Sequence, residues 1–159
     1  MNMSLREQID DFLSRKRIAV IGVSRNPADF SRSLFREFVL RGYDVVPVHP
    51  SAAEMEGKLC FTLLQNVAPP VEGALLLTAP EVTEQVVQDC AEAGITRVWM
   101  FRGGGRGAVS RQAVAFCESK GMAVVAGECP FMFFPNNGLV HGLHGFIRKI
   151  TGRYPRAAA

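Results

Sequence analysis

The 159-residue sequence has few cysteines, little net charge and no long hydrophobic run, and each shortage excludes a class of protein. Its four cysteines form no C-x-x-C pair and are spread too widely for a zinc module or a disulfide scaffold. The net charge of +3 suits an anionic small ligand but is too small for a dedicated nucleic-acid binder. No apolar run reaches the ~20 residues of a membrane span, and the charged N-terminal segment is not typical of a signal peptide. We therefore expect one cytoplasmic domain with no nucleic-acid or membrane partner.

Familiar catalytic motifs are missing as well. The sequence shows no paired carboxylates, no Ser/His/Asp set and no H-E-x-x-H zinc motif. His141 and His144 could share one face of a helix as metal ligands, but the sequence fixes no third ligand beside them. We therefore assign no catalytic residue and no metal, and we favour a binding protein over an enzyme.

Short apolar runs alternate with helical patterns along the chain. The apolar runs predict strands at residues 17–23, 44–48, 73–78, 97–101 and 122–126. Helical spacing predicts helices at residues 4–14, 31–41, 80–93 and 109–120, followed by a C-terminal helix and basic tail at residues 138–159. Strands that are apolar throughout and separated by helices indicate a parallel sheet covered on both faces.

The predicted fold is therefore α/β: a Rossmann-like, doubly wound, parallel five-stranded sheet with flanking helices and strand order 3-2-1-4-5. The whole chain, residues 1–159, forms a single domain in this prediction, with the sheet core at residues 17–130. Ligands of such sheets bind outside the carboxyl ends of the strands, at the point where the strand order reverses. We expect that point between the first and fourth strands. The segments gathered at this rim are residues 22–27, 48–51, 78–80, 102–107 and 127–130.

The turn after the first strand is the leading candidate for a phosphate site. Gly22 lets the backbone pass close to a pyrophosphate, while Ser24 and Ser31 can donate hydroxyl hydrogens to it. The turn lacks the full G-x-G-x-x-G pattern, and no Asp or Glu ends the second strand, where a dinucleotide fold holds the ribose hydroxyls. These absences favour a nucleotide other than NAD. The alternative is an ordinary strand–helix turn capped by serine.

A resemblance to a known family rests on short motifs that occur in order along this pattern. They are Gly22-x-Ser24-x-x-Pro27, Gly42-Tyr-x-Val-x-Pro-Val48, Trp99-Met100 and Cys129-Pro130. The chain resembles, from about residue 17 to residue 130, the small stand-alone CoA-binding proteins. These are similar to the N-terminal CoA-binding domain of the succinyl-CoA synthetase α subunit. The second domain of that subunit, with its phosphorylated histidine, has no room in 159 residues, so ligase activity is not implied.

The resemblance implies that coenzyme A (CoA) binds at the rim. The Gly22 turn would take the pyrophosphate, Pro47 and Val48 would flank the adenosine, and the loop at Thr78 would line the nucleotide channel. The complete predicted set is Gly22, Val23, Ser24, Arg25, Pro27, Ser31, Pro47, Val48, Lys58, Thr78, Ala79, Pro80, Arg102, Cys129 and Pro130.

Lys58 could reach a phosphate from the loop after the second strand. Two other members of this set carry alternatives. Arg102, with Arg106, could clamp the 3′-phosphate or an acyl carboxylate, or could lie on a solvated loop. Cys129 could be a reactive thiol at the rim or a small buried hydrophobe.

The sequence thus predicts a non-catalytic protein that binds CoA or an acyl-CoA as its small-molecule nucleotide ligand. One alternative is an NAD(P)-binding oxidoreductase or redox sensor on the same sheet. Another is a protein-interaction module or homo-oligomer that docks through the C-terminal segment and residues 131–134, with a vestigial nucleotide pocket.

Overall fold

The computed structural model describes residues 2–135; the predicted C-terminal helix and basic tail, with His141 and His144, lie outside the described residues. The elements follow one another as α1 (Leu5–Leu13), β1 (Arg17–Ile21), α2 (Phe30–Leu40), β2 (Asp44–Val48), β3 (Glu54–Met55), β4 (Lys58–Leu59), η1 (Leu64–Asn66), β5 (Gly73–Leu76), α3 (Pro80–Glu92), β6 (Arg97–Phe101), α4 (Arg111–Ser119), β7 (Ala123–Glu128) and η2 (Pro130–Met132).

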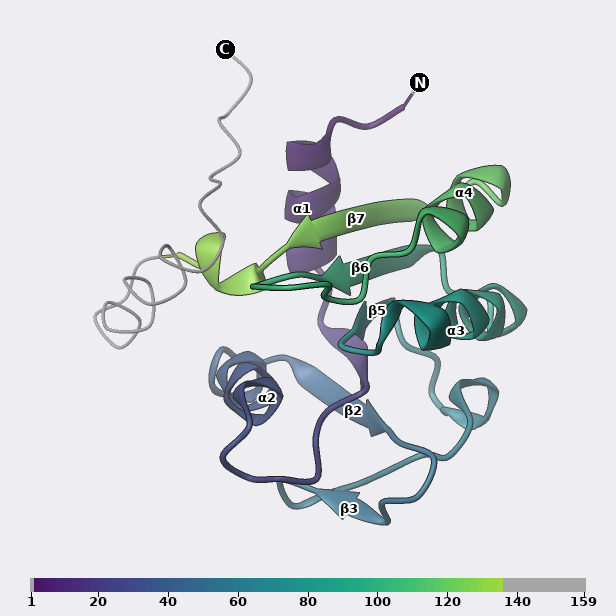
Figure 1. Ribbon diagram of the computed structural model, residues 1–159. Helices are drawn as coiled ribbons and strands as arrows, with labels where there is room; N and C mark the ends of the chain where they lie inside the picture. The colour runs from purple at the N-terminus through teal and green to yellow at the C-terminus, as the bar shows by residue number, and fades with distance from the viewer. Residues whose placement is uncertain (1, 136–159) are drawn as a thin grey trace.

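One parallel five-stranded sheet forms the centre of the fold, in the order β2-β1-β5-β6-β7 (Figure 1). The predicted α/β, doubly wound class is confirmed. The predicted order 3-2-1-4-5 is wrong, because the third predicted strand, β5, lies between β1 and β6 instead of outside β2. The strand order therefore reverses between β1 and β5.

Pro47 gives the physical reason for this order. It lies within β2, opposite Val20 of β1, and its carbonyl faces outward to accept a hydrogen bond from the Phe61 N–H (3.0 Å). Proline has no N–H to give to a second neighbouring strand, so a strand that contains it belongs at the edge of a sheet.

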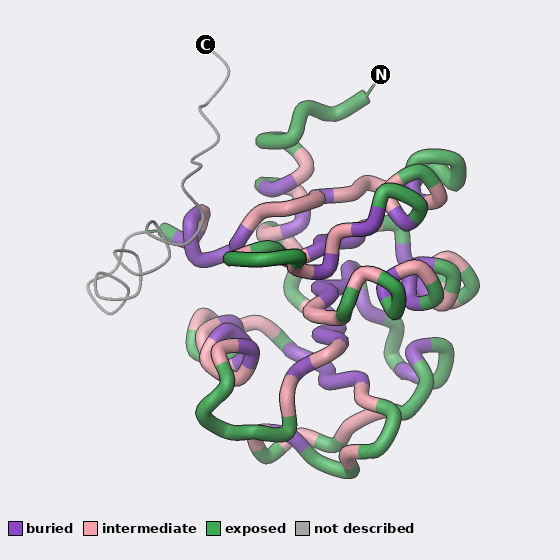
Figure 2. The backbone as a smooth tube through the Cα atoms, viewed as in Figure 1, coloured by how far each residue is buried: buried purple, intermediate pink, exposed green. Residues whose placement is uncertain are grey.

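Both faces of the sheet are apolar, because the strands are apolar at nearly every position and alternate residues point to opposite sides. Ile18 and Val20 of β1 join the core under α1 and α2, while Ala19 and Ile21 join the core under α3 and α4. Figure 2 shows the central strands as the most continuously buried part of the chain. The helices therefore cover the sheet from two sides and leave the ends of the strands open.

The predicted helix boundaries are close to those observed. Ser4 and Glu7 form a reciprocal capping box at the start of α1, and Gly42, at φ 89°, follows the end of α2. The sequence did not reveal the β3–β4 hairpin, which lies in the crossover from β2 to β5. Among residues 2–135, no helix is long and apolar enough to cross a membrane.

Asp11 ties α1 to the sheet. Its carboxylate accepts a hydrogen bond from Arg97 Nε of β6 (2.6 Å) and also pairs with Arg15. Burial alone would raise the pKa of Asp11, but the hydrogen bonds from Arg97 and Arg15 outweigh it and lower the pKa below its usual value. A carboxylate whose pKa is lower in the folded than in the unfolded state stabilises the fold above its unfolded pKa, and this stabilisation is lost as the pH falls through the folded pKa.

We predict that Asp11→Asn reduces the free energy of unfolding by about 1 kcal/mol at pH 7. The difference in the free energy of unfolding should shrink as the pH falls below about 4, because the wild-type carboxylate then becomes protonated and loses its charge. Urea denaturation across this pH range measures both effects. Asp10→Asn is the control, because Asp10 forms only an exposed pair with Arg6. Equal losses in the two variants, or a deficit independent of pH, would contradict the assignment.

Candidate functional site

A crevice opens at the carboxyl ends of β1 and β5, where the chain leaves the sheet in opposite directions. β1 leads into α2 on one face, and β5 leads into α3 on the other. Two adjoining cavities of about 370 and 470 Å³ lie there and share Gly22, Ser24 and Thr78 in their walls. This is the position at which doubly wound sheets bind ligands.

The larger of these two cavities, which we call the α3-side cavity, is predominantly apolar. Its wall consists of Ile21, Gly22, Val23, Ser24, Val48, His49, Pro50, Thr62, Leu63, Leu64, Thr78, Val82, Gln85, Val86 and Asp89. Leu63 and Val82 are large apolar side chains that remain about half exposed, at 54% and 51%. An apolar wall with a few polar groups is typical of a site for an aromatic base or another small molecule.

His49 supplies one of those polar groups in a defined tautomer. Its Nδ1 accepts hydrogen bonds from the backbone N–H groups of Ser51 (3.1 Å) and Ala52 (2.9 Å). An imidazole nitrogen that accepts carries no hydrogen, so the ring proton lies on Nε2. The side chain therefore offers an N–H donor.

The smaller of the two cavities, which we call the α2-side cavity, lies between the start of α2 and the loop after β6. Its wall consists of Gly22, Ser24, Asp29, Phe30, Ser31, Leu77, Thr78, Ala79, Phe101, Gly107 and Ala108. The ring centroids of Phe30 and Phe101 are 5.6 Å apart, and the two rings form an aromatic wall of this cavity. The two cavities together suit an elongated ligand that passes the Gly22 turn.

The turn at Gly22 is possible only with glycine. Its φ is +90°, and a Cβ atom there would lie 2.8 Å from the carbonyl carbon of Leu77. β-Carbons essentially never approach so closely, and side chains disfavour this backbone region. The chain after β1 therefore passes directly against the chain after β5.

A carboxylate occupies the helix N-terminus that the sequence suggested for a phosphate. Asp29 caps α2: its Oδ1 accepts a hydrogen bond from the Ser31 N–H (2.8 Å), and the Ser31 hydroxyl in turn accepts one from the Ser24 N–H (2.9 Å). The negative charge of Asp29 opposes an anion at this helix end. This end of α2 therefore does not attract an anion.

The structure brings about half of the predicted site residues together. Those that line a cavity are Gly22, Val23, Ser24, Ser31, Val48, Thr78 and Ala79. Those that do not are Arg25, Pro27, Pro47, Lys58, Pro80, Arg102, Cys129 and Pro130. Arg25 and Pro27 lie exposed on the turn, whereas Pro47 is buried within β2.

Cys129 lies in the hydrophobic core, with 1% of its surface exposed. Burial raises the pKa of its thiol to about 12, so the reactive thiolate is disfavoured. This geometry supports the buried alternative for Cys129 over a redox role.

The arginine-rich loop after β6 has internal partners. Arg102 Nε donates to the Gly105 carbonyl (3.1 Å), and Arg106 forms an ion pair with Glu81 in the first turn of α3. Both members of that pair are about 70% exposed, at 70% and 68%. Exposed ion pairs contribute little stability, so Arg106 can exchange its partner at low cost.

Sequence reasoning placed His49 at the rim without naming it as a site residue, and it missed Leu63, Val82, Gln85 and Asp89. Val82 has the helical spacing to Val86 that is typical of a buried helix face, and Leu63 lies in a segment without periodicity. Only the path of the β2–β5 crossover brings Leu63 toward α3.

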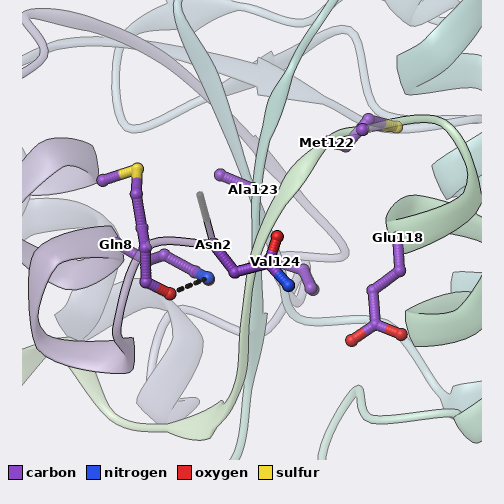
Figure 3. A pocket seen from close by; sticks show the side chains of 8 residues that line it. Asn2, Gln8, Glu118, Met122, Ala123 and Val124 are labelled. Carbon is purple, nitrogen blue, oxygen red and sulfur yellow. Dashed lines mark hydrogen bonds between the residues drawn. The ribbon is translucent and has the colours of Figure 1, made fainter.

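Another cavity, of about 550 Å³, lies at the amino end of β7 (Figure 3). It is lined by Asn2, Met3, Gln8, Glu118, Gly121, Met122, Ala123 and Val124. Gln8 Nε2 donates to the Met3 carbonyl (3.1 Å) at its edge. This cavity is larger, but it lies at the opposite end of the sheet from the crevice, and none of the sequence motifs falls in its wall.

The fold and the crevice define a class, the Rossmann-like nucleotide-binding domains. The model of the CoA binding domain family matches residues 16–135, and the chain belongs to that family. The resemblance found in the sequence is thereby confirmed.

Two curated proteins and a solved structure are similar to this chain. The uncharacterized protein YneT of Bacillus subtilis (strain 168) is 26% identical over 125 residues, covering 78% of this chain and 90% of YneT. The α subunit of ADP-forming acetate–CoA ligase II from Pyrococcus furiosus is 22% identical over 129 residues, covering 76% of this chain but 28% of the subunit. A solved structure, a hypothetical protein from Pyrococcus horikoshii OT3, has a TM-score of 0.73 and 23% identity, covering 81% of this chain and 88% of that chain. It shows that the fold is shared.

We predict that Gly22→Ala lowers the free energy of unfolding by about 3 kcal/mol or more, because it adds a clash with Leu77 to the cost of positive φ. Gly42→Ala is the matched control: φ at Gly42 is +89°, but nothing lies within 4 Å of its Cβ position. It should cost about 1–2 kcal/mol. Chemical denaturation of the two variants gives the difference, and equal costs would contradict the close approach.

Proposed function

We propose that this protein binds CoA or an acyl-CoA in the crevice between β1 and β5. The observation that carries the proposal is the pair of adjoining cavities, which meet at the Gly22 turn in a chain of the CoA-binding family. CoA is an elongated ligand with a nucleotide at one end and a pantetheine arm at the other. Two compartments joined by a narrow polar turn match this division.

In this proposal the adenosine lies in the α3-side cavity, between Leu63 and Val82. The pyrophosphate lies beside the Gly22 side of the turn, away from Asp29. The pantetheine arm continues into the α2-side cavity, where Phe30 and Phe101 contact it. Apolar contact supplies most of the affinity, and the polar groups fix the orientation.

Charged residues near the crevice then bind the phosphates. Arg25 is exposed on the turn itself, and Arg106 can leave Glu81 for the 3′-phosphate or an acyl carboxylate. Arg102 and Lys58 would have to move to reach the ligand, since neither lines a cavity.

The alternatives find less support in the geometry. The carboxyl end of β2 presents Val48 and His49 to the cavity, so no carboxylate lies at the position that holds the ribose hydroxyls of NAD. The carboxylate in the cavity wall, Asp89, comes from α3 and accepts hydrogen bonds from Gln65 and Gln85. Phe131 and Phe134 are 2% and 6% exposed and pack in the core, so they offer little surface to a partner protein. We therefore propose a binding role without catalysis, in the reducing cytoplasm that the widely spread cysteines favour.

The proposal predicts that the full-length protein, titrated by calorimetry, binds CoA or acetyl-CoA more tightly than NAD. Loss of the 3′-phosphate, tested with dephospho-CoA, should weaken binding if arginine engages that group. Equal affinity for CoA and NAD, or no binding of CoA, would contradict the proposed function.

A matched pair of leucines tests the position of the adenosine. Leu63→Ala should weaken CoA binding about three- to tenfold, because the ligand buries this side chain. Leu59→Ala should leave the affinity unchanged, since Leu59 is 77% exposed and lines neither cavity. Equal effects of the two substitutions would argue against adenosine in the α3-side cavity.

A further inference from the structure

Glu56 occupies a backbone conformation that suits glycine or asparagine. It forms, with Gly57, the two-residue turn between β3 and β4, and φ is positive at both positions, 51° and 76°. Two-residue hairpin turns of this kind strongly prefer Asn-Gly or Asp-Gly, and a longer side chain at positive φ is unfavourable. The contacts of the Glu56 side chain explain why a glutamate occupies this position.

The side chain of Glu56 binds two arginines one turn apart on α2. Arg32 Nε donates to Oε1 (2.7 Å), and Arg36 Nε donates to Oε2 (3.0 Å). The side chains of Glu56 and Arg32 are 20% and 12% exposed, so the contact is largely shielded from water. Oε1 also lies 2.7 Å from Arg32 Nη2 and 2.9 Å from Arg36 Nη2, so the single carboxylate fixes both guanidinium groups.

The same arginines hold the backbone of the Gly22–Pro27 turn with their remaining N–H groups. Arg32 Nη1 donates to the carbonyls of Ser24 (3.3 Å) and Arg25 (3.2 Å). Arg36 Nη2 donates to the carbonyl of Pro27 (3.1 Å). The hairpin carboxylate, the two guanidinium groups and the turn therefore form one continuous network.

The network is not needed to attach the hairpin. Met55, the residue before Glu56, is 3% exposed and packs in the same core cluster as Leu34 and Phe35 of α2. This apolar contact already holds the hairpin against the helix. The charged network adds an orientation of the turn that apolar contact cannot specify.

We propose that Glu56 is a positioning residue for ligand binding: it orients Arg32 and Arg36 so that they hold the carbonyls of the turn and direct the Arg25 N–H toward a ligand phosphate. The N–H groups of Ser24 and Asn26 already donate to the Ser31 and Ser24 hydroxyls. In a trans peptide the carbonyl and the following N–H point in opposite directions. A Ser24 carbonyl held by Arg32 therefore sets the direction of the Arg25 N–H. This inference rests on the proposed CoA site.

Two substitutions separate positioning from stability. Glu56→Gln keeps the size of the side chain and removes its charge. Glu56→Gly removes the side chain but suits the positive φ, so it relieves the turn while it abolishes the contact with both arginines. The control is Glu37→Gln, which breaks the shielded ion pair with Arg41 elsewhere on α2.

The readouts are hydrogen exchange of the backbone N–H groups of Ser24, Arg25, Asn26 and Ala28 without ligand, and calorimetric titration with CoA. Both Glu56 variants should speed exchange in this segment and raise the Kd for CoA about tenfold, while Glu37→Gln should change neither. Unchanged exchange, unchanged Kd or tighter binding in the Glu56 variants would overturn the inference, the last because it would make Glu56 only a neutraliser of the arginines. If the unsubstituted protein binds no CoA, the proposed function fails by itself, and the exchange rates still decide whether Glu56 positions the turn.

Discussion

The crevice depends on one close approach, that of the chain after β1 to the chain after β5. At Gly22 the backbone passes so near Leu77 that no Cβ atom fits, and φ of +90° turns the chain toward α2. β5 meanwhile continues toward α3 on the other face of the sheet. The two cavities open on either side of this point and share Gly22, Ser24 and Thr78. A larger residue at Gly22 would separate the strand ends and alter both cavities together.

The charges around the turn are arranged to hold the protein backbone more than to attract an anion. Asp29 neutralises part of the helix dipole of α2. Arg32 and Arg36 of that helix donate their N–H groups to Glu56 and to backbone carbonyls. In the proposed site, phosphate affinity would rely on the oriented Arg25 N–H and on exposed arginines such as Arg106. Such a site holds a nucleotide mainly by shape and apolar contact, which agrees with the apolar α3-side cavity.

Local patterns in the sequence predicted the elements well, since each apolar run and each capping residue acts over a few neighbours. Strand order depends on where a crossover passes, and the same alternation of elements permits several orders. Pro47 was the available signal, because proline favours an edge strand. The cavity wall was harder to predict, because Leu63 comes from an aperiodic segment and Val82 has the helical spacing of a core residue. Cys129 follows the predicted strand end, yet its side chain turns into the core.

Amide chemical-shift mapping of the full-length protein during titration with CoA tests the central claim most directly. The account predicts that the largest changes occur at Gly22, Ser24, Leu63 and Thr78, on both sides of the turn. The cavity at the amino end of β7 provides the internal comparison, since it is the larger one and lies at the other end of the sheet. Changes concentrated at Gln8 and residues 121–124, or no changes at all, would contradict the assignment of the crevice as the ligand site.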